Sequence, residues 1–170
     1  MDKRWIYIII IAIIGVGCLY FIAESSTIIG SANTDLDKFL LKVPDSFNIE
    51  KSTDTQIRLI NRQSGERINI LFLGTGSDVD DDIDNKIESL SKNTNITLLK
   101  NTTLKLKNTT VPCIYYEKSP NNSVNKVAFI TKFDCKFSIE CANFNDNESV
   151  DKNIKEISDT LKRDFKQKQD

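Results

Sequence analysis

The first apolar segment of the chain is an uncharged run from Trp5 to Ala23. At about 1.5 Å per residue, a helix over residues 5–23 reaches roughly 28 Å, close to the hydrocarbon thickness of a bilayer. A lone segment in lipid must bond its backbone internally, so the run predicts one transmembrane helix despite its many isoleucines. A cleavable signal peptide is the alternative: its apolar part is typically about 7 to 15 residues long, and Gly30-Ser31-Ala32 offers a cleavage site.

Charges on the two sides of this run predict its orientation. Lys3 and Arg4 precede it and Glu24 follows it. Because positive residues stay on the cytoplasmic side, we expect a signal anchor in the cell membrane with the rest of the chain outside the cytoplasm. The expected divisions are a cytoplasmic N-terminus at residues 1–4, the anchor at 5–23, a flexible tether at 24–35, one extracytoplasmic domain at 36–165, and a charged tail at 166–170.

Short apolar runs bounded by turn residues predict the strands of the domain. The first, residues 39–43, stops at Pro44-Asp45-Ser46. Two runs on either side of Gln63-Ser64-Gly65 predict a β-hairpin. The hairpin strands are expected at 55–61 and 66–73, and later strands at 97–107, 111–117, 127–131 and 137–141, with a turn at 133–135.

Two stripes of apolar residues at spacings of three and four predict amphipathic helices. The first helix is expected to begin near Ser77 and the second to be capped near Asn147. This order of elements predicts an α+β fold, with helices on an antiparallel β-sheet. The stripes are Val79, Ile83, Ile87 and Leu90 in the first helix, and Val150, Ile154, Ile157, Leu161 and Phe165 in the second.

The short motifs of the domain resemble a known superfamily. "FLLKVPDSF", "TLLKNTTLKLKNTTVPCIYYE", "FSIEC" and "IKEISDTLK", in this order around the hairpin and helix, are similar to PsbP-like domains. More narrowly, they resemble membrane-anchored archaeal proteins that carry such a domain. The resemblance covers residues 36–165. It implies an α-β-α sandwich and a protein-binding role without a shared active site, and no family binding residue can be transferred to this chain.

The amino-acid composition argues against several classes of function. The chain has 23 Lys and Arg against 24 Asp and Glu, so it carries no basic excess that would attract nucleic acid. It has no histidine, which removes the commonest general base and the commonest metal ligand. We therefore expect no catalytic residue, no metal-binding residue and no cofactor, and we predict that the protein is not an enzyme.

Two motifs at residues 74–84 resemble a dinucleotide-binding loop and a calcium-binding loop, but each lacks residues that the loop requires. Gly74-Thr75-Gly76 lacks the third glycine of a dinucleotide loop, and the acidic side chains that follow would repel phosphate, so no nucleotide is expected. "DVDDDID" has the alternating carboxylates of a calcium loop, but Ile83 and Ser89 stand where the loop needs glycine and glutamate. An ordinary acidic first turn is favoured over weak divalent binding.

Three cysteines beyond the anchor leave two alternatives. Outside the cytoplasm, Cys113 could pair with Cys135 or Cys141 and leave one free thiol. Equally, all three could be small buried apolar residues.

Five sequons of the form N-x-[ST] make glycosylation feasible outside the cytoplasm. They begin at Asn95, Asn101, Asn108, Asn121 and Asn147.

The favoured function is a membrane-tethered interaction domain that binds another envelope or membrane protein. It predicts an apolar or aromatic surface patch, for which Tyr115, Tyr116 and Phe144 are the candidates. The first alternative is an envelope enzyme that uses carboxylates or a divalent metal, which predicts a deep pocket with convergent acids. The second is a glycosylated structural surface protein.

Overall fold

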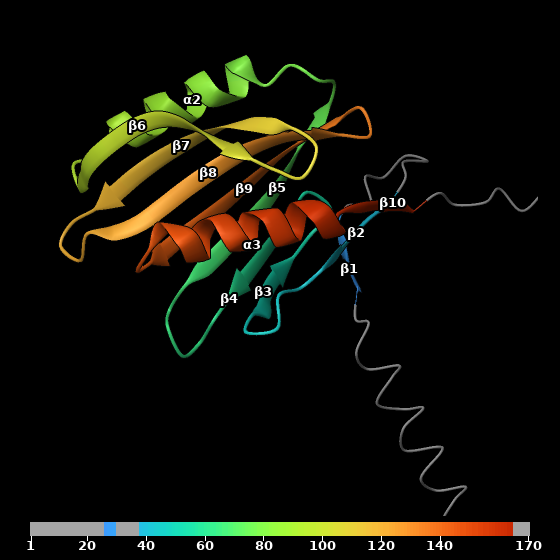
Figure 1. Cartoon of the computed structure of the whole chain (residues 1–170), viewed down its shortest axis with the longest axis horizontal. Helices are drawn as coiled ribbons and strands as arrows, with labels where there is room; N and C mark the ends of the chain where they lie inside the picture. Colours follow the sequence, from blue (N-terminus) through green and yellow to red (C-terminus); the bar gives the residue numbers. More distant parts are fainter. Residues whose placement is uncertain (1–25, 30–37, 165–170) are drawn as a thin grey trace, which may run out of the picture.

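The structure is a computed structural model that describes residues 26–29 and 38–164. Its centre is a seven-stranded sheet in which every neighbouring pair is antiparallel, in the order β3-β4-β5-β9-β8-β7-β6 (Figure 1). The strands are β3 (Asn48–Ser52), β4 (Gln56–Ile60), β5 (Arg67–Thr75), β6 (Ile96–Lys105), β7 (Thr110–Lys118), β8 (Ser123–Lys132) and β9 (Cys135–Phe144).

Local side chains and backbone conformations explain the tight turns. Between β4 and β5, the Asn61 side chain accepts hydrogen bonds from the Gln63 and Ser64 amides at 3.0 and 3.3 Å. Between β8 and β9, Phe133 and Asp134 both have positive φ, 58° and 57°, as a two-residue hairpin turn requires. The predicted hairpin and the predicted turn are therefore confirmed, although Cys135 belongs to β9 and not to the turn.

Helix α2 (Asp80–Ser91) covers one face of the sheet at the β6 to β9 end. Its predicted apolar stripe packs on residues of β7 and β8 such as Ile114, Tyr116 and Phe129. Gly76, with φ of 115°, lies in the segment between β5 and this helix, whereas Gly74, with φ of 112°, is still within β5 at a register shift opposite Lys136.

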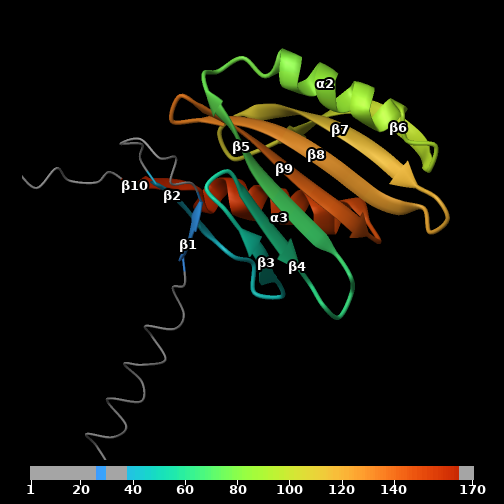
Figure 2. The same ribbon diagram turned by 180° about the vertical axis from the view of Figure 1, so that it is seen from behind.

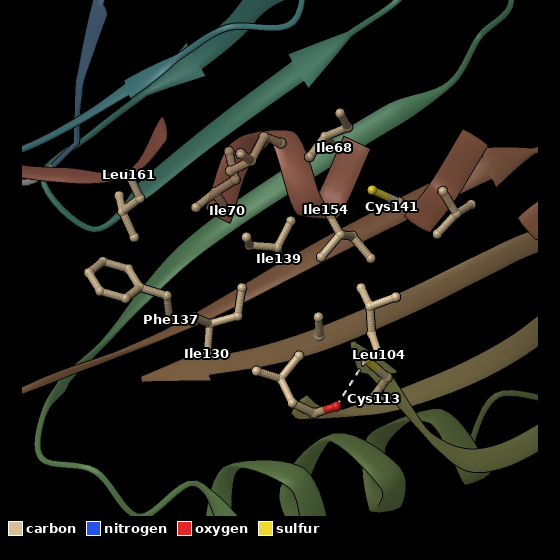
Figure 3. Close-up of a cluster of buried hydrophobic side chains, with 14 of the residues drawn as sticks. Ile68, Ile70, Leu104, Cys113, Ile130, Phe137, Ile139, Cys141, Ile154 and Leu161 are labelled. Atoms are coloured by element: carbon tan, nitrogen blue, oxygen red, sulfur yellow. Dashed lines mark hydrogen bonds between the residues drawn. The ribbon is translucent and has the colours of Figure 1, made fainter. Parts of the chain in front are cut away.

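Helix α3 (Asn147–Thr160) packs on the opposite face and closes the larger core. Ile68 and Ile70 of β5, Phe137 and Ile139 of β9, and Ile154 of α3 meet there (Figure 3). The predicted layering, an antiparallel sheet with a helix on each face, is confirmed. The N-cap, however, is Asp146, whose carboxylate accepts from the Ser149 amide at 2.7 Å, and not Asn147.

A second, three-stranded sheet lies beside the C-terminal end of α3 (Figure 1). Its order is β1 (Ser26–Ile29), β2 (Lys38–Lys42) and β10 (Lys162–Asp164). We name it the small sheet. Residues 26–29, expected in the tether, form β1, and the second helix ends at Thr160, so Leu161 follows the helix and does not continue it.

The predicted transmembrane helix at residues 5–23 and the predicted helical position of Phe165 lie outside the described residues. Within the part of the chain that is described, neither helix has the length and apolar character needed to span a bilayer. The anchor therefore stays a prediction.

Candidate interaction surface

The aromatic side chains proposed for a surface patch are in the core. Tyr115, Tyr116 and Phe144 are all buried, Tyr116 and Phe144 completely. The prediction failed because β7 is covered on both faces: Tyr115 packs toward α3 and Tyr116 toward α2. A strand that is buried on both faces shows no alternation of apolar and polar residues, so its sequence does not indicate which aromatic side chains are exposed.

The most polar buried contact lies where α2 meets β9. The Tyr116 hydroxyl donates to Glu140 Oε1, and Lys86 Nζ lies 3.1 Å from Glu140 Oε2. One turn earlier on the helix, Asp82 pairs with Lys136 Nζ at 2.7 Å. Burial, followed by the negative charge of Glu140, raises the pKa of Tyr116. Each group has a protein partner, so the cluster fastens α2 to the sheet and leaves no group free to act on a substrate.

A second buried ion pair joins the sheet to α3. Lys126 Nζ of β8 lies 2.5 Å from Asp151 Oδ1, and the lysine side chain is only 8% exposed. Cys113 and Cys141 lie on the same face of the sheet, close enough for their pKa values to respond to both charges. Lys126 lowers and Asp151 raises the pKa of each thiol, and burial remains the largest influence on both values.

The three cysteines among the described residues, Cys113, Cys135 and Cys141, are buried, and no disulfide joins any two of them. Burial raises the pKa of Cys113 to about 12 and that of Cys141 still further, so neither is a nucleophile at neutral pH. The proposed disulfide from Cys113 to Cys141 is not formed. Because β8 lies between β7 and β9, the Cα atoms are at least two strand spacings apart, roughly 9 Å, beyond the reach of a disulfide.

Cys135 is also buried, and it begins β9 at the register position of Lys132. The pairing of Cys113 with Cys135 is absent for the same reason, since β8 again separates the two strands. The structure therefore agrees with the alternative in which all three thiols are small core residues.

The acidic run at residues 78–84 lies at the start of α2. Asp78 Oδ1 accepts the Asp80 amide at 3.0 Å, and Asp80, Asp81 and Asp82 lie in the first turn of α2, where negative charge is favourable. No group of three or more Asp, Glu or Cys side chains in residues 26–29 and 38–164 could hold a metal ion.

One depression of about 310 Å³ lies between the β6–β7 turn, the end of β8 and the end of α3. Its lining includes two basic residues, Lys107 and Lys132, and Lys132 donates to the carbonyls of Ser158 and Leu161 at 2.8 and 2.7 Å. Burial lowers the pKa of this lysine. Asp159 is the one acid in the lining, so this depression does not contain the convergent acids that an envelope hydrolase would need.

The largest part of the central sheet without a helix is the α2-side face of β3, β4 and β5. Figure 2 shows these strands in the foreground, with α3 behind them and α2 over the other end of the sheet. We call this surface the open face. Its half-buried residues alternate with the core residues of β4 and β5, and belong to neither hydrophobic cluster. They are Gln56, Arg58, Ile60, Asn69 and Leu71.

Strand register fixes how these residues neighbour one another. Gln56 is opposite Leu71, and Arg58 is opposite Asn69. The Gln56 amide donates to Asn69 Oδ1 at 2.7 Å, which orders the centre of the surface. Arg58 is held only weakly, 3.8 Å from Glu50, with both side chains well exposed. Leu71 and Ile60 lie at opposite ends of this pairing, opposite Gln56 and Arg67, so the open face has two separate apolar residues with the Arg58 guanidinium between them.

Large exposed apolar residues elsewhere are isolated from one another. Among the described residues they are Ile49 (46% exposed), Leu98 (40%) and Phe133 (37%), on β3, β6 and the β8–β9 turn. Single residues of this kind are ordinary on a protein surface. Ile49 is on edge strand β3 and is the register partner of the core residue Leu59, so it lies on the sheet face opposite the open face.

The five sequon asparagines are all exposed. Asn95, Asn101 and Asn108 lie before, within and after edge strand β6, and the Ser119 amide at the start of the β7–β8 turn donates to the Asn95 carbonyl at 2.8 Å. None lies on β3, β4 or β5, so glycans at these positions would leave the open face accessible.

Sequence reasoning missed the open face, although a signal was present. In "QIRLI" and "RINIL" the core positions alternate as expected, yet Ile60 and Leu71 are apolar residues in the phase that should be polar.

Comparisons with known proteins show a similarity of fold. No protein-family model and no curated protein matches the chain. Among solved structures, the chain is similar to cyanobacterial PsbP (CyanoP) from Synechocystis sp. PCC 6803, with a TM-score of 0.43 and 11% identity over 82% of this chain and 92% of that chain. This similarity to a PsbP fold assigns no function, and the archaeal and membrane-anchored parts of the resemblance stay predictions.

Proposed function

We propose that this protein is a membrane-tethered, extracytoplasmic interaction domain without enzymatic activity, and that its open face binds another envelope or membrane protein. The observation that carries the proposal is the presence of two half-buried apolar side chains, Ile60 and Leu71, on a sheet face that neither of the two described helices covers. The tether and the compartment are supported by the uncharged run at residues 5–23 and the basic residues before it.

The composition of the open face favours a protein partner. Interfaces combine an apolar centre with arginine and with polar groups that form hydrogen bonds at the rim. Leu71 and Ile60 supply the apolar area, Arg58 supplies an exposed guanidinium, and the Gln56–Asn69 pair is already ordered. On edge strand β3, Lys51 is the register partner of Arg58 and shares this face, whereas Ile49 is the partner of the core residue Leu59 and lies on the other face.

We favour an interaction domain over an enzyme. A depression of about 620 Å³ on α3 is lined by two acids, Glu148 and Asp151, but Asp151 is paired with Lys126 at 2.5 Å. The buried thiols have raised pKa values, the polar cluster at Glu140 is internally satisfied, and the depression near Lys132 contains one acid. The structural alternative, a glycosylated surface protein without a specific ligand, is the competing proposal. It predicts no discrete partner for the open face.

Site-specific photocrosslinking in native membranes tests the proposal. A photoreactive residue at Leu71 should give a discrete adduct of higher mass, since this side chain lies within the proposed contact. The control position is Lys155, an exposed residue of α3 on the opposite side of the sheet. No adduct from Leu71, or equal adducts from both positions, would reject the open face as the binding surface.

A further inference from the structure

The small sheet begins almost where the predicted anchor ends. Ser26, the first residue of β1, is three residues after Ala23. At no more than about 3.6 Å per residue, these residues span at most roughly 11 Å. The polar layer on each side of a bilayer is about 5 to 8 Å thick. If residues 5–23 span the membrane, β1 lies at the headgroup layer, so this inference rests on the proposed tether.

The small sheet turns one face toward the core and the other toward solvent. In its central strand β2, Phe39 and Leu41 are buried in the main cluster, whereas Leu40 is half-exposed and Lys42 is exposed. Lys162 of β10 is the exposed antiparallel partner of Leu40, so the two residues share the outward face. Ile28 of β1 occupies the register position on the other side of Leu40.

The small sheet is basic although the whole chain is not. Its strands contain Lys38, Lys42, Lys162 and Arg163 against the single acid Asp164, whereas the chain has a formal net charge of −1. Acids flank the strands at Asp45 and Asp159, and Asp35 and Asp37 precede β2 in the sequence. Arg163 is the register partner of the core residue Phe39, so the outward positive charge comes from Lys42 and Lys162.

We propose that the outward face of the small sheet lies against the bilayer and binds anionic lipid headgroups through Lys42 and Lys162. An ammonium group near a membrane surface is attracted by lipid phosphate, and the half-exposed Leu40 between the lysines suits the boundary between headgroups and acyl chains. This contact fixes the domain on the membrane, in contrast to the flexible tether expected from the sequence.

The full chain reconstituted in lipid vesicles tests this contact. A Cys18→Ala background with Ser46→Cys, an exposed residue in the turn after β2, allows one donor dye to be attached, because the other three thiols are buried. Energy transfer to acceptor lipids reports how close this turn is to the bilayer. Vesicles of neutral phosphatidylcholine are compared with vesicles that contain phosphatidylglycerol, at low and high salt.

We expect stronger energy transfer in the anionic vesicles, and loss of the difference at high salt. At about 1 kcal/mol for each lysine, neutralisation lowers the ratio of docked to undocked protein about five-fold per residue. Lys42→Gln with Lys162→Gln should therefore reduce it about 25-fold. Lys152→Gln with Lys155→Gln, two exposed lysines of α3, is the control with the same change of charge and should retain the difference.

The outcomes separate this contact from the tether. Energy transfer that is independent of lipid charge, or unchanged in the Lys42 and Lys162 double variant, overturns the headgroup contact while the tether stands. Loss of the wild-type protein from floated vesicles after alkaline carbonate extraction overturns the tether, and the headgroup contact with it.

Discussion

Buried cysteine and tyrosine side chains belong to the core and stay un-ionised at neutral pH. The thiol of Cys113 lies between α3 and the sheet and is 3% exposed, and Tyr116 is completely buried beneath α2. Both groups resist ionisation because burial disfavours their charged forms. Residues that would suggest catalysis in a sequence therefore stabilise the fold in the molecule.

Alkaline pH should destabilise the protein through Cys113. Its pKa is raised from 9.0 to about 12 in the fold, so between these values the unfolded thiol ionises and the folded one does not. The stability contribution is present below pH 9 and is lost as the pH rises toward 12, at about 1.4 kcal/mol per pH unit. Urea denaturation at several pH values measures the slope. Cys113→Ala should lessen it, and an unchanged slope would contradict the assignment.

Removal of the Tyr116 hydroxyl should weaken the attachment of α2. Tyr116→Phe deletes the donor to Glu140 in a buried site and is expected to cost about 2 kcal/mol in the free energy of unfolding. Tyr115→Phe is the control, because the Tyr115 hydroxyl bonds to the partly exposed Glu117 at 2.6 Å, where water can replace it. Equal losses in urea denaturation would show that Glu140 is not the important partner.

At the scale of elements, the periodicity of the sequence predicted the helices and hairpin that depend on residues close together in the chain. The two apolar stripes located α2 and α3, and the turn residues located the β4–β5 hairpin. It missed β3, whose five residues are all exposed, because an edge strand without a buried face has no alternation. It also missed β1 and β10, because these short strands form only by pairing with β2 from distant parts of the chain.

The same limit applies to the candidate surface. The sequence gives the residues of β4 and β5 but not which sheet face a helix covers, since that depends on where α2 and α3 pack. The Tyr115, Tyr116 and Phe144 patch was wrong for this reason, and the open face became visible only with the positions of both helices.

The pairing of α3 with the sheet yields a prediction at this scale. Asp151→Ala leaves Lys126 charged and almost buried, and should cost about 3 kcal/mol in the free energy of unfolding. Adding Lys126→Met should recover most of the loss, because the uncompensated charge is removed. The control is Glu88→Ala, which breaks an exposed helix pair with Lys92 and should cost less than about 0.5 kcal/mol. Urea denaturation measures all three variants, and no recovery in the double variant would contradict the account.

For the whole molecule, the proposed topology puts residues 24–170 outside the cytoplasm. Gln63→Cys places a thiol in the exposed β4–β5 turn, and a membrane-impermeant maleimide should label it in intact cells. Wild-type protein should stay unlabelled because its described thiols are buried. Asp2→Cys should react only after the membrane is opened. Labelling of position 2 in intact cells, or protection of position 63 from labelling, would contradict the proposed orientation.

The open face is the central claim at this scale, and substitution of Leu71 tests it most directly. Leu71→Asp places a charge in the proposed contact, and Leu98→Asp makes the same change on exposed edge strand β6. The measurement is the amount of partner recovered with the tagged full chain after crosslinking in native membranes, quantified by mass spectrometry. We predict at least a ten-fold loss for Leu71→Asp, about 1.4 kcal/mol or more of binding free energy, and no change for Leu98→Asp. Equal recovery with both variants, or no reproducible partner with the wild type, would contradict the account.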